Sequence, residues 1–307
     1  MAATPTLSVV LPVFNEEASI EELHRRLLAA LEPLRQSFEV IYVDDGSSDG
    51  SKDLLCGFAQ RDPRVGVLVL SRNFGHQVAL SAGVDHARGD AVVLMDSDLQ
   101  DPPELIPELV GRWKEGFDVV YAQRRARQGE SIFKRATAYL FYRLVRLIAT
   151  IDVPPDTGDF RLLSRRAADA LRSLRERRRF LRGMVVWAGF RQTKVLYDRP
   201  ARSLGESKYR LRTMVRLAMT AAFSFSNFPI SLLGIAGGIV CAGSVFAFWR
   251  SGASAPTLAL FFLGGVQLLG LWVLGQYLVA IAEEVRRRPL YLIQEKVNLQ
   301  SSPAKDA

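Results

Sequence analysis

Residues 91–98 read AVVLMDSD, and this stretch decides the fold that we expect. Its first five residues are apolar, as in a strand that a sheet covered on both faces would bury. Asp96 and Asp98 follow at the point where that strand should end. Residues 38–45, FEVIYVDD, show the same pattern of a strand that ends in two aspartates. Because ligands of open α/β sheets bind beyond the carboxyl ends of the strands, both acidic pairs indicate a binding site there.

The rest of the N-terminal half alternates between strand and helix patterns. Further strands are predicted at 7–13, 65–70 and 118–122. Helices are predicted at 18–34, 52–60, 75–87 and 105–113, the first from apolar residues spaced three and four apart. This order predicts an α/β domain with a mostly parallel sheet and helices on both of its sides.

The C-terminal half has a different composition. No charged residue occurs from Leu217 to Trp249 or from Ser251 to Ala282. A helix needs about 20 apolar residues to span a bilayer, so we predict two transmembrane helices, at 230–249 and 257–282. The alternative is a buried hairpin in the core of a soluble domain.

Flanking charge predicts the orientation of these spans. The connecting loop holds only Arg250, whereas basic residues lie on both outer sides, at Lys208, Arg210, Arg212, Arg216 and 286–288. The positive-inside rule then places both termini and the N-terminal domain in the cytoplasm, on an inner or plasma membrane. The first apolar run lacks a basic region before it and contains Pro12, so we expect no secretory signal.

These patterns divide the chain into four parts. We expect a domain over 1–210, a juxtamembrane segment over 211–229, two spans within 230–282 and a cytoplasmic tail over 283–307. Within the domain, residues 132–150 mix basic, aromatic and leucine side chains. They are typical either of a helix in the membrane interface or of an ordinary packing helix.

Charge and motifs narrow the ligand. The net charge of +8 and pI near 9.7 favour anionic partners. The sequence holds neither GxGxxG nor GxxxxGK[ST], so a dinucleotide site or a P-loop is poorly supported. A divalent metal carried by a diphosphate would explain the acidic pairs, because carboxylates suit Mg²⁺ or Mn²⁺.

Six segments occur in a fixed order: VVLPVFNEE, VDDGSSDG, SRNFGHQVAL, MDSDLQDPPE, DTGDFRLL and RSLGESKY. Together they resemble family 2 glycosyltransferases with the Rossmann-like GT-A fold, and within these the dolichyl-phosphate mannose synthase and bactoprenol glucosyltransferase branch. The resemblance covers residues 7 to about 210, and the paired C-terminal spans extend it.

The resemblance implies roles for particular residues. The catalytic residues would be Asp98 and Asp159, with Asp159 beside the acceptor as a base or an orienting group. The ligands of Mg²⁺ or Mn²⁺ would be Asp96, Asp98 and Gln100. The nucleotide-sugar would contact Pro12, Phe14, Glu16, Asp44, Asp45, Asp96, Ser97, Arg124, Arg202 and Lys208. In the family, a small Gly-Ser type pair often precedes the arginine that corresponds to Arg124, and here Ala122 and Gln123 stand in its place.

The implied reaction is inverting transfer of a hexose, with glucose as the first expectation, from a nucleotide-sugar to polyprenyl phosphate. UDP-glucose is the favoured donor, and undecaprenyl or dolichyl phosphate is the acceptor. GDP-mannose and UDP-linked amino sugars or pentoses remain alternative donors, and a non-catalytic membrane scaffold is the alternative class. A processive polysaccharide synthase would show a QxxRW segment and more spans, and the sequence has neither. We expect contact with membrane lipids, no nucleic-acid partner, and self-association through small residues of the spans.

Four further features have simpler interpretations. Asp49 and Asp101 each precede a predicted helix and are expected to cap it. His76 is expected to be a structural histidine. The basic run 172–182 is expected to contact anionic headgroups and the acceptor phosphate, with a solvated surface or a nucleic-acid patch as alternatives.

Overall fold

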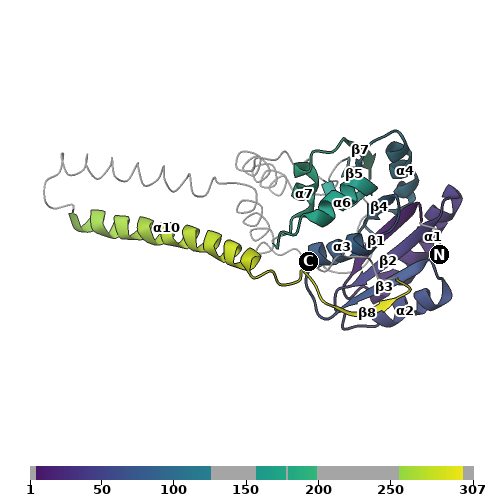
Figure 1. The fold of residues 1–307 in the computed structure, drawn as a ribbon, viewed down its shortest axis with the longest axis horizontal. Helices are drawn as coiled ribbons and strands as arrows, with labels where there is room; N and C mark the ends of the chain where they lie inside the picture. Colours follow the sequence, from purple (N-terminus) through teal and green to yellow (C-terminus); the bar gives the residue numbers. More distant parts are fainter. Residues whose placement is uncertain (1–4, 126–156, 178, 199–255, 300–307) are drawn as a thin grey trace.

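The computed structural model describes residues 5–125, 157–177, 179–198 and 256–299. These residues form an eight-stranded sheet in the order β7-β5-β6-β4-β1-β2-β3-β8 (Figure 1). The strands are β1 Leu7–Val13, β2 Phe38–Asp44, β3 Val65–Leu70, β4 Ala91–Leu94, β5 Val119–Arg124, β6 Thr157–Ser164, β7 Gln192–Tyr197 and β8 Ile293–Val297. The helices are α1 Glu17–Leu31, α2 Ser51–Arg61, α3 His76–His86, α4 Ile106–Lys114, α6 Arg165–Ser173, α7 Leu181–Trp187 and α10 Pro256–Val285, with 3-10 turns at η1 Glu32–Leu34 and η2 Pro103–Leu105.

The predicted α/β fold is confirmed. Strands β4, β1, β2 and β3 run parallel at the centre of the sheet, as do β5 and β7 near one edge. Strand β6 lies antiparallel between β4 and β5. The five strands expected from apolar runs are present, whereas β6, β7 and β8 were not anticipated.

Helices cover both faces of the sheet. Side chains alternate between the two faces along each strand, so the buried strands present apolar side chains to the helices on both sides. On β1, Val9 and Leu11 join a core with α1, α2 and α4, while Val10 joins a second core with α3, α6 and α7. All residues of β1, β2 and β3 are buried, which explains why their sequences are nearly uniform in apolar character.

The second core brings α3 very close to the sheet. A Cβ atom added to Gly83 would lie 2.1 Å from Cγ1 of Val10. Only glycine permits this approach, and it sets the position of α3, whose first residues enter the candidate site.

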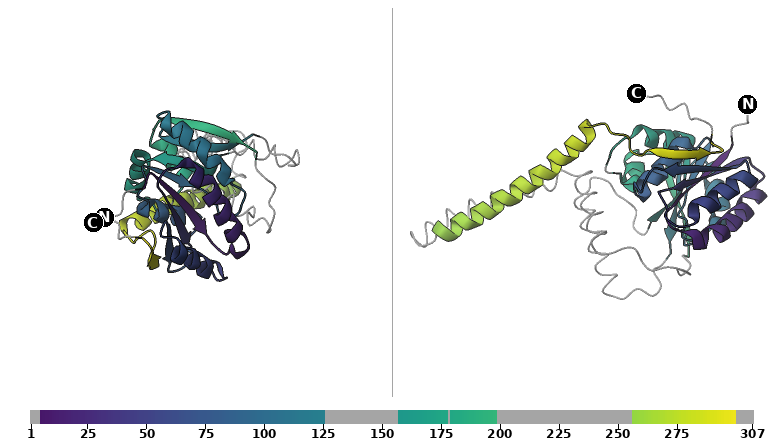
Figure 2. Two further views of the ribbon diagram at one scale, coloured as in Figure 1. Left: turned by 90° about the vertical axis from the view of Figure 1, so that its right-hand side faces the viewer. Right: turned by 90° about the horizontal axis from the view of Figure 1, so that it is seen from below.

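Helix α10 extends away from the sheet domain, and the chain then returns to add β8 to the edge at β3 (Figures 1 and 2). The segment after 283 was expected to be a tail, but part of it completes the sheet. Several large apolar side chains of α10 are exposed, namely Leu260, Leu271, Trp272, Leu274, Leu278, Val279, Ile281 and Val285. Within the residues that the structure describes, no helix combines the length and the apolar character needed to cross a membrane.

Several expectations lie outside the described residues. These are the span at 230–249, the juxtamembrane segment 211–229, the helix at 132–150, and the two basic residues Arg202 and Lys208. The span predicted at 257–282 coincides in position with α10 and stays a prediction.

Candidate active site

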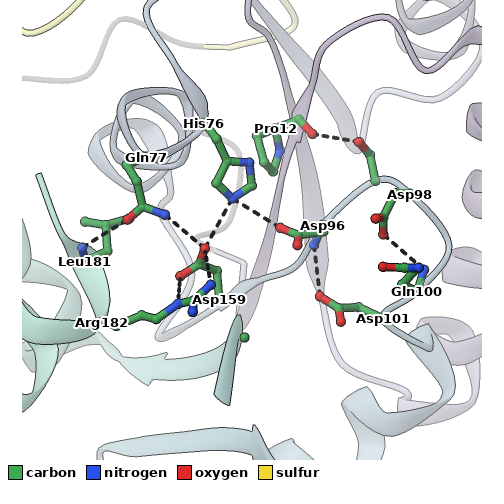
Figure 3. Close-up of polar contacts among 12 residues, drawn as sticks. Pro12, His76, Gln77, Asp96, Asp98, Gln100, Asp101, Asp159, Leu181 and Arg182 are labelled. Carbon is green, nitrogen blue, oxygen red and sulfur yellow. Dashed lines mark hydrogen bonds and ion pairs between the residues drawn. The ribbon is translucent and has the colours of Figure 1, made fainter. Parts of the chain in front are cut away.

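The turn after β4 carries the predicted metal ligands (Figure 3). The carboxylate of Asp98 accepts a hydrogen bond at 3.1 Å from the backbone N–H of Gln100, and Leu99 between them has a positive φ of 61°. This local bond closes the turn and keeps Asp98 and Gln100 together. The hydroxyl of Ser97 donates to the carbonyl of Pro12 at 2.8 Å, which fastens the turn to the end of β1.

Asp101 has a different role from the one that we predicted. The 3-10 turn that follows begins at Pro103 without a side-chain cap. Because Pro102 and Pro103 have no N–H, they cannot donate to a capping carboxylate. Asp101 is instead 1% exposed and accepts bonds from the N–H of Asp96, at 3.3 Å, and from the hydroxyl of Tyr197, at 3.2 Å. The prediction of a helix cap was wrong, and Asp101 stabilises the turn that carries Asp96 and Asp98.

The second acidic pair lies at the end of β2, as expected. The two oxygens of Asp45 accept bonds from the N–H groups of Phe74, at 2.7 Å, and Gly75, at 2.9 Å. Gly75 has φ +101°, which favours glycine, and α3 begins at the next residue. Burial raises the pKa of both Asp44 and Asp45. The bonds of Asp45 thus fix the start of α3.

Asp159 lies on β6 and is enclosed by donors. Arg182 donates to both of its oxygens, from Nε at 2.8 Å and from Nη2 at 3.2 Å, and Gln77 donates at 2.9 Å. The Nε2 atom of His76 lies 3.3 Å from the same carboxylate. Burial would raise the pKa of Asp159, but Arg182 and His76 outweigh it and hold that pKa well below its usual range. Asp159 is therefore held in its ionised form, and both of its oxygens accept hydrogen bonds.

His76 connects the two halves of the site. Its Nε2 atom lies 3.2 Å from Oδ1 of Asp96 as well as 3.3 Å from Oδ2 of Asp159 (Figure 3). Burial would lower the pKa of His76, but the two carboxylates outweigh this effect and raise it well above its ordinary value. We expected a structural histidine, and its carboxylate partners do satisfy it. The sequence analysis did not foresee that it would join Asp96 to Asp159.

Two sets of side chains could hold a metal. His76, Asp96 and Asp159 each offer a ligand atom, and these atoms lie within 4.8 Å of one another. The predicted set of Asp96, Asp98 and Gln100 supplies only oxygens, which Mg²⁺ and Mn²⁺ prefer. Within the described residues, the buried Oδ1 atom of Asp96 accepts no hydrogen bond and has only the ion pair with His76. This oxygen fits a ligand role better than the carboxylate of Asp159, which Arg182 and Gln77 already occupy.

Three other residues predicted to contact the nucleotide-sugar lie in the described part of the chain. Phe14, just after β1, is 38% exposed, and Glu16 accepts a bond from the hydroxyl of Ser19. Arg124 ends β5, and its Nε atom donates to the hydroxyl of Tyr197 at 3.5 Å. Arg124 is thereby linked through Tyr197 to Asp101 in the turn after β4.

Asp49 and the basic run 172–182 were given simpler interpretations, as a helix cap and as a contact for anionic headgroups. Asp49 accepts bonds from the N–H of Ser51, where α2 begins, and from that of Glu17, where α1 begins. Where the basic run is described, its side chains contact protein groups. Arg172 donates to a carbonyl of α3 and Arg179 to a carbonyl in the loop after α6. Arg175 and Arg182 pair with Asp85 and Asp159, and the side chain of Arg177 donates to the carbonyl of Arg288. The run therefore ties the domain together, and its last member enters the site.

Comparison with known proteins gives a consistent result. The model of the family described as Glycosyl transferase family 2 matches residues 8–172. The chain is 43% identical to the uncharacterized glycosyltransferase sll0501 of Synechocystis sp., over 98% of each chain. It is 38% identical to the bactoprenol glucosyl transferase of Shigella phage SfII, over 94% of this chain and 97% of that one.

A solved structure of glucosyl-3-phosphoglycerate synthase from Mycobacterium tuberculosis is 22% identical, covers 71% of this chain and 78% of its own, and has a TM-score of 0.46. The extent of the family match and the identity to relatives of nearly equal length are decisive. The chain belongs to glycosyltransferase family 2 and is a glycosyltransferase similar to the bactoprenol glucosyl transferases.

Proposed function

We propose that this glycosyltransferase moves a hexose, first of all glucose, from a nucleotide-sugar to polyprenyl phosphate at the cytoplasmic face of a membrane, with inversion. UDP-glucose is the favoured donor. The observation that carries the proposal is the contact of His76 with both Asp96 and Asp159. It brings the residues assigned to the donor and to the acceptor within one side chain of each other. The names of the bactoprenol glucosyl transferases, at 35–38% identity over nearly the whole chain, support the acceptor class.

The donor side of the site would use a divalent cation. Asp96, Asp98 and Gln100 would hold Mg²⁺ or Mn²⁺, which supplies positive charge to the departing nucleoside diphosphate. Arg124 adds positive charge at the end of β5, and Arg202 and Lys208 are proposed to do so from outside the described residues. Phe14, Glu16 and the acidic pair after β2 are proposed to contact the nucleoside.

The acceptor side needs little proton transfer. A phosphate monoester has a second pKa of about 6, so it is largely dianionic at neutral pH and is already a nucleophile. The low pKa of Asp159 makes it a poor base, and its buried oxygens are engaged by Arg182 and Gln77. We therefore propose that Asp159 positions its neighbours and removes no proton.

A membrane location would place the site beside the lipid phosphate. The uncharged stretches 217–249 and 251–282 and the exposed apolar side chains of α10 support membrane association. An anchored site searches for its lipid acceptor locally rather than throughout the solution. We propose that the sheet domain and both termini face the cytoplasm.

A lipid-product assay tests the function. Purified full-length protein in detergent would receive Mn²⁺ or Mg²⁺, undecaprenyl phosphate and, in separate reactions, labelled UDP-glucose, GDP-mannose, UDP-amino sugars and UDP-pentoses. We expect label from UDP-glucose in the organic phase, lost in Asp98→Ala and kept in Asp53→Ala, which removes an exposed carboxylate on α2. Label from another donor would correct the sugar. No label together with no metal-dependent nucleotide binding would favour the scaffold alternative.

A further inference from the structure

Helix α3 begins between the two sides of the candidate site. Asp45, on the side that we assign to the donor, accepts bonds from the N–H groups of Phe74 and Gly75 directly before the helix. Gln77 is the second residue of α3 and lies toward the side that we assign to the acceptor, where Asp159 and the start of α7 are found (Figure 3). A helix start that is held from the donor side thus presents one side chain to the acceptor side.

Helix α7 has no capping side chain of its own. Phe180 occupies its N-cap position, and the hydrocarbon ring has no oxygen that could accept from the N–H groups of the first turn. The side-chain oxygen of Gln77 accepts instead from the N–H of Leu181, the first residue of the helix, at 3.0 Å. A residue of α3 therefore supplies the cap of α7.

The other end of the same amide holds Asp159. The Nε2 atom of Gln77 donates to Oδ2 of Asp159 at 2.9 Å (Figure 3). The N–H of Leu181 can only donate and the ionised carboxylate can only accept, so the two bonds are compatible with one orientation of the amide. Because an amide is neutral, Gln77 makes both bonds without changing the charge of the site.

We propose that Gln77 is a positioning residue for the transfer: it holds Asp159 and the start of α7, on the acceptor side, in place against the donor side. This inference rests on the proposed function and deepens it. Gln77 acts through its two partners and touches neither substrate. Its effect is on alignment of the reacting groups, and a misplacement of about 1 Å can lower a rate about a hundredfold.

A similar pair of bonds at the other end of β6 provides a matched control. The hydroxyl of Ser164 accepts from the N–H of Ala167 at 3.3 Å, which caps α6, and donates to the buried carboxylate of Asp118 at 2.9 Å. Ser164 thus joins a helix start to a buried aspartate, as Gln77 does. It pairs with Ala91 at the start of β4, and the candidate site lies beyond the end of that strand. Ser164→Ala should therefore lower stability and leave the kinetics unchanged.

Steady-state kinetics of the full-length protein test this assignment, with undecaprenyl phosphate and the donor that gives product. We expect Gln77→Met, which removes both bonds, to lower kcat/KM for the lipid by about tenfold or more. Calorimetry with Mn²⁺ and the nucleoside diphosphate of that donor should show a Kd within about twofold of the wild type. Gln77→Glu keeps an oxygen for the N–H of Leu181 but has no N–H to donate to Asp159, so its kcat/KM for the lipid should also fall. Ser164→Ala should leave both values within about twofold.

Hydrogen exchange followed by mass spectrometry measures the link between α3 and α7 without any transfer. In the full chain without ligands, Gln77→Met should speed exchange of the amides of 181–187, because the cap of α7 is lost. Ser164→Ala should speed exchange at 165–173 and leave 181–187 unchanged. Faster exchange at 181–187 in Gln77→Met, with no product from the wild type and any donor, would reject the proposed function and support the positioning of α7 by Gln77.

Three outcomes would overturn the inference. One is an active wild type whose kcat/KM for the lipid is unchanged in Gln77→Met and Gln77→Glu. Another is an equal loss in Ser164→Ala, or a matching loss of nucleotide binding in Gln77→Met, since either would indicate a general loss of structure. The third is exchange of 181–187 at the same rate in Gln77→Met and the wild type.

Discussion

Replacement of Asp159 by asparagine should destabilise the domain strongly, because it removes the counter-charge of a buried cluster. Breaking a buried ion pair by deleting one partner costs about 3–5 kcal/mol. Asparagine keeps one carbonyl oxygen that can accept from Arg182, so we take the lower end, about 3 kcal/mol. For a domain of roughly 200 residues, each kcal/mol shifts the Tm by about 2–4 °C, which gives a decrease of roughly 6–12 °C.

Thermal unfolding of the purified full chain in detergent at pH 7.5, without ligands, measures this shift. Asp118→Asn is the matched control, because the carboxylate of Asp118 is 6% exposed and holds Arg166 in the same fork. Arg166 is 68% exposed, so water can solvate it once the partner is lost, and we expect a decrease of only about 2–4 °C. Equal decreases in the two variants, or no decrease in Asp159→Asn, would refute the view of Asp159 as a buried anchor.

Three other perturbations test separate parts of the structure. Tyr197→Phe removes the hydroxyl that donates to Asp101 and should weaken Mn²⁺-dependent nucleotide binding by about tenfold in calorimetry, since a hydrogen bond to a charged group contributes about 1.5 kcal/mol at the low end. Unchanged binding would contradict a role in holding the turn. Gly83→Ala should destabilise the protein by roughly 1–3 kcal/mol through overpacking, whereas Gly111→Ala, in a helix with nothing within 4 Å of the added Cβ, should stabilise it slightly. Burial lowers the pKa of His86, so below about pH 6.5 the unfolded chain binds a proton that the folded chain excludes, and the free energy of unfolding falls as the pH falls. In chemical denaturation between pH 6.5 and 5, the free energy of unfolding of His86→Leu should therefore fall less steeply than that of the wild type. An identical dependence on pH in the two proteins would contradict this.

The central sheet could be predicted from sequence because its strands are buried on both faces. An uninterrupted apolar run such as 91–95 is typical of a strand that is covered on both faces of a sheet. Strand β8, with the sequence IQEKV, carries no such pattern, because it is an edge strand whose central residues are exposed. Its position depends on the free edge of β3, a partner more than 200 residues away in sequence.

In the site, too, local sequence patterns identify some residues, whereas others are brought in by partners that are distant in sequence. Asp96 and Asp98 follow a recognisable strand, so their place at the edge of the sheet could be inferred locally. Arg182 ends the segment RERRRFLR, and no local feature separates it from the other arginines of that run. Gln77 and His76 open a helix that follows β3, a position at the carboxyl edge that could have identified both as candidates. Their partners on β6 and α7 come together only in the folded sheet.

The acceptor that we propose, a lipid phosphate, would explain why the carboxylate of Asp159 can be engaged by hydrogen-bond donors. An enzyme that activates a hydroxyl needs a base that can take up a proton, and therefore a carboxylate with an available lone pair and a pKa close to neutrality. A phosphate dianion presents the opposite problem, since it needs no deprotonation and is repelled by an exposed carboxylate. The arrangement around Asp159 fits this second requirement, because Arg182, His76 and Gln77 surround its buried carboxylate. A low pKa at Asp159 is thus the property expected of an orienting group, as the proposed function requires, rather than of a base.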